Sequence, residues 1–128
     1  MGTQIKIASA RPLVVIVDDD PAIRSSLVFS LQTEGYSVRS YASGTELLGA
    51  DLTAEASCLV VDYQLPGMNG LDLVAELRRR QVAAPAILIT THPTAAVRER
   101  AMATGVAIIE KPLLGDALFH EIHAATHR

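Results

Sequence analysis

The sequence has little cysteine, few aromatic residues and no long apolar run. Its single cysteine, Cys58, excludes an internal disulfide framework and is compatible with a reducing cytoplasm, where we expect the protein to be located. No stretch approaches about 18 consecutive uncharged apolar residues, which argues against a membrane-spanning helix. Aromatic residues make up 4% of the chain and tryptophan is absent. The core must therefore be built mainly from Val, Ile, Leu and Ala.

A large excess of positive charge is also absent. Lys and Arg number 11, Asp and Glu number 14, and the formal net charge is −3. This balance lacks the basic footprint of a nucleic-acid-binding protein, so we expect this chain itself to bind neither nucleic acid nor a membrane. A length of 128 residues suits one compact domain. We expect residues 1–10 to form a flexible N-terminal extension and residues 11–128 to form the domain.

Apolar runs alternate with helical patterns along the chain. Residues 13–17 form a continuous apolar run, typical of a central parallel strand that is buried on both faces. Further strands are predicted over residues 36–41, 58–62, 86–90 and 106–109. Helices are predicted from Pro21 to just before Gly35, from Ser43 through Leu48, over 71–80, over 94–103, and around Leu114, Leu118 and Ile122. With right-handed crossovers, this alternation predicts an α/β fold, a three-layer sandwich around a parallel sheet.

Polar residues stand at the carboxyl ends of the predicted strands. The acidic run Asp18–Asp20 follows the first strand, and Asp62 ends the third. Thr90 ends the fourth strand and Lys111 follows the fifth. Ligands of an open α/β sheet bind beyond the carboxyl ends of its strands, so we expect these side chains to share one pocket. Two like charges about 4 Å apart repel by about 4 kcal/mol at an effective dielectric constant of about 20.

Such a pocket requires a cation or proton uptake. Hard oxygen ligands that leave room for water and a phosphate oxygen suit Mg²⁺. Asp20 directly precedes Pro21, so we expect it to cap a helix rather than to bind metal. Thr90 offers a hydroxyl and Lys111 a cation, so a carboxylate could attack a phosphoryl group here while the oxygens are neutralised. Taken singly, Thr90 could be only a strand residue and Lys111 only a solvated charge.

Four motifs, in this order, make the chain resemble the receiver domains of two-component response regulators. They are VDDDP at 17–21, DYQLPGMNG at 62–70, ILIT at 87–90 and EKP at 110–112. The resemblance spans residues 13 to about 125. It implies a flavodoxin-like (βα)5 fold whose parallel sheet has the strand order 2-1-3-4-5.

The resemblance also implies an acceptor and a set of metal ligands. Asp62 would be the phospho-acceptor and would contact Mg²⁺. Asp19 would be a direct ligand of the ion, and Asp18 would act on it through water. The main-chain carbonyl of Gln64 would complete the ligands from the protein.

Two further residues and a partner follow from the resemblance. Thr90 would follow the phosphoryl group, Lys111 would form an ion pair with it, and the peptide bond between Lys111 and Pro112 is expected to be cis. A sensor histidine kinase, a phosphotransfer protein or a small acyl phosphate would donate the phosphoryl group. The domain would be regulatory, not an enzyme, with only its own phosphorylation and dephosphorylation as reactions. It would signal to a partner, or to a second copy in a homodimer, through the predicted helix 94–103, strand 106–109 and last helix.

Two residues depart from the family pattern and keep alternatives open. Ile108 stands where the family usually has an aromatic residue, so an aromatic rotamer switch is unavailable. Thr91 stands where Ala or Gly is usual. A degenerate receiver, acting as a phosphorylation-independent interaction module, is therefore one alternative. The other is a hydrolase like the dehalogenase-like phosphatases, which place a second acid two residues after the nucleophile, where this chain has Gln64.

Overall fold

A single parallel sheet forms the centre of the molecule. The computed structural model describes residues 11–50 and 55–127, and the extension expected at residues 1–10 lies outside the described residues. The strands are β1 (Leu13–Val17), β2 (Ser37–Tyr41), β3 (Ala56–Asp62), β4 (Ala86–Thr90) and β5 (Ala107–Glu110). Their order is β2-β1-β3-β4-β5, and every neighbouring pair is parallel. This order confirms the predicted flavodoxin-like fold.

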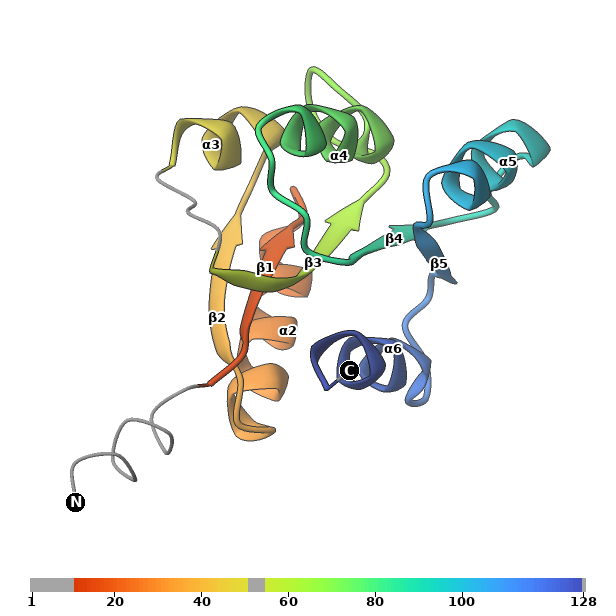
Figure 1. Cartoon of the computed structure of the whole chain (residues 1–128). Coiled ribbons are helices and arrows are strands. Elements are labelled where there is room, and N and C mark those ends of the chain that lie inside the picture. Colours follow the sequence, from red (N-terminus) through yellow and green to blue (C-terminus); the bar gives the residue numbers. More distant parts are fainter. Residues whose placement is uncertain (1–10, 51–54, 128) are drawn as a thin grey trace.

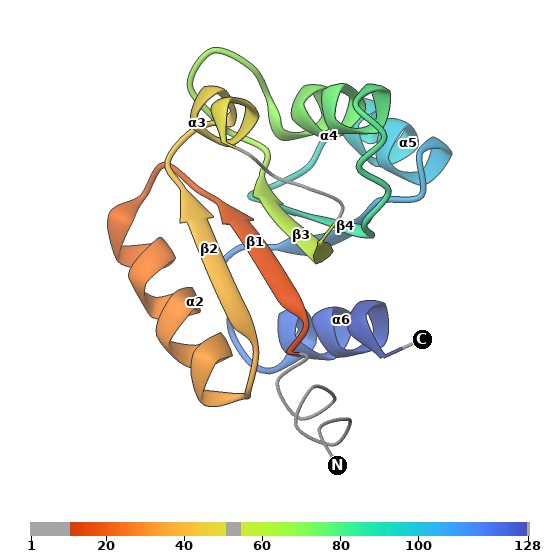
Figure 2. The same ribbon diagram turned by 60° about the vertical axis from the view of Figure 1, so that its left-hand side comes forward.

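Helices cover both faces of the sheet. They are α2 (Pro21–Thr33), α3 (Gly44–Gly49), α4 (Gly70–Arg79), α5 (Ala95–Ala103) and α6 (Ala117–Thr126). Figures 1 and 2 show α3, α4 and α5 on one side of the sheet and α2 and α6 on the other. The predicted three-layer α/β sandwich is therefore confirmed.

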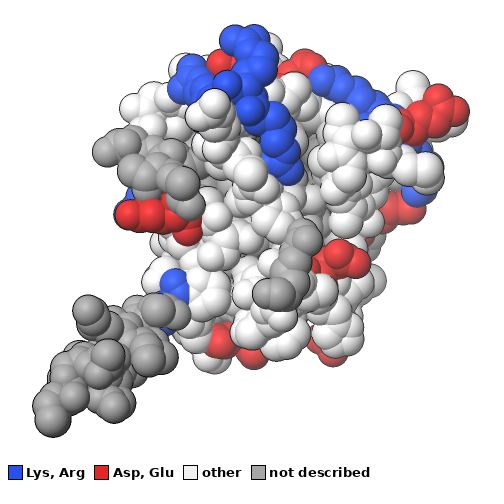
Figure 3. All heavy atoms as spheres, in the orientation of Figure 1, with Lys and Arg blue, Asp and Glu red and all other residues white. Residues whose placement is uncertain are grey.

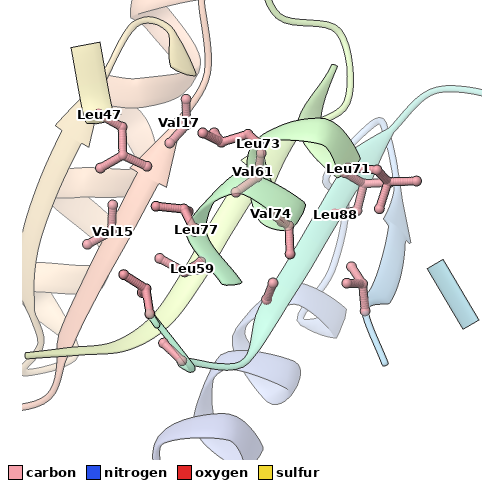
Figure 4. Close-up of a cluster of buried hydrophobic side chains, with 14 of the residues drawn as sticks. Val15, Val17, Leu47, Leu59, Val61, Leu71, Leu73, Val74, Leu77 and Leu88 are labelled. Atoms are coloured by element: carbon pink, nitrogen blue, oxygen red, sulfur yellow. The ribbon is translucent and has the colours of Figure 1, made fainter. Parts of the chain in front are cut away.

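Each face of the sheet has its own apolar core. Successive side chains of a strand point to opposite faces, so Val17 of β1 packs in one core and Ile16 in the other. The first core includes Leu77 of α4, and the second includes Ile122 of α6. Figure 4 shows the first core, with side chains of α4 lying over Val61 of β3. The central strands are thus fixed from both sides.

Burial along the strands follows their place in the sheet. Every residue of β1 and of β4 is buried, as expected for central strands with continuous apolar sequences. The edge strands β2 and β5 are at most half-buried along their length. The carboxyl ends of the central strands therefore stand on the most deeply buried part of the fold.

Polar side chains fix where the helices begin. Asp20 accepts a hydrogen bond of 2.9 Å from the N–H of Ala22 and caps α2, as predicted. Ser43 caps α3, Asn69 caps α4 and Thr94 caps α5 through the same kind of bond. The loops that leave β1, β3 and β4 therefore end in defined helix starts.

Several boundaries differ from the prediction, most of them by one residue. Strand β3 begins at Ala56, two residues earlier than expected, and β5 lies one residue later than expected. Leu114, predicted to belong to the last helix, lies before α6 and is 79% exposed. Gly115 follows it with a φ of 75°, a left-handed conformation that a helix cannot continue through. The apolar spacing from Leu114 to Leu118 was therefore misleading.

Basic side chains gather at one end of the layer formed by α3, α4 and α5. Figure 3 shows them at the top of the molecule, where Figure 1 draws α3 and α4. Arg79 and Arg80 each form an ion pair of 3.1 Å with Glu76 of the same helix.

Within residues 11–50 and 55–127, none of the helices has the length and apolar character needed to span a membrane.

Candidate functional site

The carboxyl ends of the central strands meet at one edge of the sheet. Strand β3 pairs with β1 on one side and with β4 on the other. Asp18 directly follows β1, Asp62 is the last residue of β3, and Thr90 is the last residue of β4. Lys111 directly follows β5 at the same edge. The strand-end residues singled out in the sequence are therefore brought to one place.

Three carboxylates converge there. Oxygens of Asp18, Asp19 and Asp62 all lie within 4.8 Å of one another. Asp18 is 1% exposed and Asp62 is 4% exposed, whereas Asp19 is exposed to solvent. Among the described residues, this is the one cluster of three or more acidic, His or Cys side chains with the spacing of a metal site. The carboxylate of Asp20 instead caps α2.

Lys111 supplies positive charge to the two buried acids. Its Nζ donates a hydrogen bond of 3.1 Å to Oδ2 of Asp62 and lies 3.6 Å from Oδ2 of Asp18. Burial raises the pKa of the Asp62 carboxyl, the charge of Asp18 raises it further, and Lys111 only partly opposes this shift. Burial disfavours the ammonium form of Lys111, but the hydrogen bond and charge of Asp62 raise the pKa of Lys111 overall. A single lysine therefore leaves the pocket short of positive charge.

One buried oxygen of the pocket lacks a hydrogen-bond donor. Oδ1 of Asp18 accepts a bond of 2.9 Å from the N–H of Asp20. Oδ2 of Asp18 is buried and has no hydrogen-bond donor among the described residues, since Lys111 stands beyond bonding distance. An unpaired buried polar atom costs about 1–3 kcal/mol, more when charged. Three converging carboxylates are the hard oxygen ligands that Mg²⁺ prefers, so the residues present fit this ion.

Gly70 lets the start of α4 approach the end of strand β3. Its N–H donates a hydrogen bond of 2.9 Å to the carbonyl of Tyr63. A Cβ at this position would lie 2.5 Å from the carbonyl oxygen of Asp62 and 2.8 Å from the side chain of Leu88. Of the two glycines in this loop, only Gly67 has the positive φ, 83°, of a turn residue. Gly70 is required by close packing instead.

Two predicted site residues lie at the rim, and their roles stay predictions. Thr90 is buried, and its carbonyl accepts a hydrogen bond of 2.8 Å from the N–H of Lys111, which ties the end of β4 to the residue after β5. Gln64 is exposed, and its N–H donates a long bond of 3.4 Å to Oδ1 of Asp62. The peptide bond between Lys111 and Pro112 is cis, as expected.

The two residues that depart from the family pattern, Thr91 and Ile108, both line a groove that Lys111 shares with the acidic pocket. Thr91 is exposed and lines a groove of about 940 Å³ together with Lys111. The groove runs between α2 and the segment that leads from β5 into α6. Ile108 is half-buried and packs against the core that contains α4. The aliphatic residue on β5 is therefore anchored in the fold, in place of an aromatic side chain.

Arg24 is a residue of the site that no sequence motif indicated. Its Nη1 donates a hydrogen bond of 2.6 Å to the main-chain carbonyl of Asp18, six residues earlier. Arg24 lies in the first turn of α2, the helix that opens directly after the acidic run. A basic residue one turn into that helix was the available signal, but its bond to a carbonyl depends on the fold.

The chain is similar in sequence to a known family and to curated proteins. The sequence model of the response regulator receiver domain family matches residues 14–123. Nodulation protein W of Bradyrhizobium diazoefficiens is 37% identical over 122 residues, which cover 94% of this chain and 54% of that protein. The transcriptional regulatory protein FixJ of Azorhizobium caulinodans is 34% identical over 116 residues, which cover 90% and 55%. The chain thus spans about half the length of these curated relatives.

Solved structures show the same fold. A CheY-like receiver domain protein from Methanospirillum hungatei superposes with a TM-score of 0.83 and 26% identity, covering 91% of this chain and 94% of that one. The response regulator TrrA from Thermotoga maritima, solved in complex with Mg²⁺ and BeF, has a TM-score of 0.75 and 27% identity, covering 89% and 98%.

Proposed function

The chain belongs to the family of response regulator receiver domains, and on this basis we propose that it is a phosphorelay receiver whose acceptor is Asp62. The observation that carries the proposal is the cluster of three carboxylates, with the ammonium of Lys111 bonded to Asp62. This arrangement supplies a nucleophile, a place for a divalent cation and a fixed positive charge within one pocket. The fold is that of a regulatory domain, and we assign it no other substrate.

The proposed reaction transfers a phosphoryl group to one carboxylate oxygen of Asp62. A new O–P bond forms while the bond from phosphorus to the donor's nitrogen or acyl oxygen breaks, and the donor keeps that electron pair. Asp18, Asp19, Asp62 and the main-chain carbonyl of Gln64 would hold Mg²⁺, which neutralises phosphoryl oxygens when bound. That TrrA, at 27% identity, was solved with Mg²⁺ supports the choice of ion. Lys111 would neutralise a second part of the developing charge.

The proposed output is a shift in the balance between two conformations. A phosphoryl group adds roughly −1.5 to −2 charges, by analogy with other phosphorylated side chains. Moving a two-state equilibrium from 1:99 to 99:1 needs about 5.5 kcal/mol, whereas one charge-assisted hydrogen bond contributes about 1.5–3 kcal/mol. The hydroxyl of Thr90 alone is therefore insufficient. Lys111 must contribute as well, and its N–H is already bonded to the carbonyl of Thr90.

The proposed partners act at two surfaces. A sensor histidine kinase or phosphotransfer protein would donate from the groove beside α2, because Lys111 lines both this groove and the acceptor pocket. The conformational change would alter the surface formed by α5, β5 and α6, which would bind a partner protein or a second copy in a homodimer. Met102 on α5 is 81% exposed, which offers an apolar contact there.

Intact-mass analysis after treatment with acetyl phosphate tests the proposal. We expect the mass gain of one phosphoryl group when Mg²⁺ is present and none when it is removed by a chelator. Asp62→Asn should abolish the gain, while Asp72→Asn, which removes an exposed carboxylate on α4, should leave it intact. A gain without Mg²⁺, or one that survives Asp62→Asn, would contradict the proposed chemistry.

An interaction module that works without phosphorylation is the second candidate, favoured by the aliphatic Ile108 on β5. Its signature would be equal partner binding by the wild type and Asp62→Asn, with and without acetyl phosphate. The receiver hypothesis predicts a difference between these two proteins only when the donor is present. A phosphatase is the third alternative. The second acid that such phosphatases use is replaced by Gln64 in this chain. Steady turnover of a phosphate ester by the protein would be needed to support this alternative.

A further inference from the structure

We propose that Arg24 is a positioning residue of the acidic pocket, a role that rests on the proposed function. It holds the main-chain carbonyl of Asp18 and thereby keeps Asp18 and Asp19 turned toward Asp62. The bond is short, 2.6 Å, and partly buried, and its donor is a permanently charged guanidinium. Arg24 acts through Asp18 rather than on the phosphoryl group.

All polar atoms of Asp18 but one are occupied by partners outside the pocket. Its N–H donates a bond of 3.1 Å to the carbonyl of Tyr41 on β2. Its carbonyl accepts from Arg24, and its Oδ1 accepts from the N–H of Asp20. The remaining atom is the buried Oδ2, which lies 3.6 Å from Nζ of Lys111. Asp18 is thus held in place by these bonds, and its one oxygen without a hydrogen bond lies on the side of Lys111, where a cation would bind.

The clamp extends to Asp19 through the peptide unit. The carbonyl held by Arg24 belongs to the planar peptide unit that joins Asp18 to Asp19. Because the unit is planar, fixing the carbonyl oxygen also fixes the position of the Cα atom of Asp19. Asp19 is exposed, yet its carboxylate lies within 4.8 Å of the other two. Without Arg24 the carbonyl would lose its charged donor. Rotation of this unit toward water would then carry Asp19 away from the pocket.

The charge of Arg24 and its positioning role have opposite effects on cation binding. A guanidinium beside an anionic pocket repels Mg²⁺, so a purely electrostatic residue would strengthen Mg²⁺ binding when it is removed. A group that orients metal ligands typically changes metal affinity 10- to 100-fold, and its removal weakens binding. The sign of the change therefore separates the two roles.

Calorimetric titration of the full chain with Mg²⁺ alone measures that sign. Arg24→Met removes the charge and the donor but keeps the length of the side chain, and we expect it to weaken binding about tenfold or more. Arg24→Lys keeps a charged donor and should recover most of the affinity. Arg79→Met removes an arginine whose side chain is 77% exposed on α4, and should leave the affinity unchanged.

A kinetic measurement separates positioning from a merely structural role. In Arg24→Met, the Mg²⁺ concentration that gives half-maximal phosphorylation by acetyl phosphate should rise by the same factor as the dissociation constant. The rate at saturating Mg²⁺ should change much less. A residue that only stabilised the fold would lower the amount of folded protein and leave that half-maximal concentration unchanged.

Several outcomes would overturn the inference. Unchanged or tighter Mg²⁺ binding in Arg24→Met, with wild-type binding intact, overturns this inference alone. A wild-type chain that binds no Mg²⁺ overturns the proposed function and this inference with it. If circular dichroism shows that Arg24→Met does not fold, Arg24→Gln takes its place with the same expected weakening.

Discussion

The acidic pocket and the proposed response face lie along the same sheet but differ in how deeply their strands are buried. The pocket consists of Asp18, Asp19, Asp62, Thr90 and Lys111, and the response face consists of α5, β5 and α6. The acids and Thr90 of the pocket stand at the ends of central strands that are almost wholly buried. On the response face, β5 is at most half-buried, and Ala101 is the only buried residue of α5.

This difference matches what each region has to do under the proposed function. Phosphoryl transfer needs charges held in place before the donor arrives, and burial together with main-chain hydrogen bonds provides that preorganisation. A response needs an element that can shift at low cost in free energy, and elements with few buried contacts open most easily.

A large effect is expected where the start of α4 packs most closely on strand β3. Gly70→Ala places a Cβ 2.5 Å from the carbonyl oxygen of Asp62, so strand β3 or helix α4 must move. We expect urea denaturation to show a loss of about 3 kcal/mol in the free energy of unfolding, the upper part of the range for overpacking. Gly49→Ala is the matched control because nothing lies within 4 Å of its added Cβ. The control should lose nothing, and equal losses in both variants would contradict a tightly packed acceptor.

A second large effect is expected from the charge of the pocket. Wild-type protein should gain about 2.7 kcal/mol of stability when Mg²⁺ is present at 100 times its dissociation constant. Asp18→Asn removes a buried carboxylate of the cluster, and we expect it to lose most of this gain. Without Mg²⁺ the same variant should unfold at a higher temperature than the wild type, because it removes the repulsion between the buried carboxylates of Asp18 and Asp62.

The control for this second effect is Asp72→Asn, which removes an exposed carboxylate of α4 that pairs with Arg100. It changes the net charge by the same amount and should keep the full gain from Mg²⁺ in thermal unfolding. If it loses the gain as well, the effect is one of overall charge and the pocket has no special role.

The central strands, and the pocket residues at their ends, could be predicted from the sequence for a physical reason. A strand buried on both faces must be apolar at every position, so β1 and β4 have continuous apolar sequences. The first polar residue then marks the carboxyl end, which is how Asp18 and Thr90 were located. A half-exposed strand has no such boundary, and the expected limits of β5 were displaced by one residue.

Other features depend on tertiary geometry that no local pattern contains. Leu114 has helical spacing to Leu118, but a left-handed Gly115 separates it from the helix. Arg24 could have pointed to water like other helix-surface arginines, and only the fold shows that it reaches the carbonyl of Asp18. The packing requirement at Gly70 arises because β3 and β4 meet α4 there.

A smaller effect is expected from β5, the strand of the response face that leads into Lys111 of the pocket. Ile108→Ala removes a half-buried side chain of β5, and we expect a loss of about 1–2 kcal/mol in the free energy of unfolding, below the range for full burial. The yield of acetyl phosphate adduct should not change. Leu88, which lies beside Ile108 in the sheet and is fully buried, is the matched comparison.

Leu88→Ala should cost about 2–5 kcal/mol because it leaves a cavity in the core against which α4 packs. Equal losses in the two variants would mean that β5 is packed as firmly as β4. A fall in adduct yield in Ile108→Ala would mean that the response face takes part in the chemistry. Either result would remove the contrast between the regions.

The smallest effect is expected at the ion pair that joins α5 to the end of β5. Nη2 of Arg98 lies 2.7 Å from Oε2 of Glu110, and both side chains are about half exposed. Exposed ion pairs contribute about 0.2–1 kcal/mol and are screened by salt. A double-mutant cycle with Arg98→Ala and Glu110→Gln should give a coupling in this range that falls as salt is added, with adduct yield unchanged. A larger coupling that salt does not reduce would show that α5 is held as rigidly as the acceptor, because a pair resistant to screening is one that water does not reach.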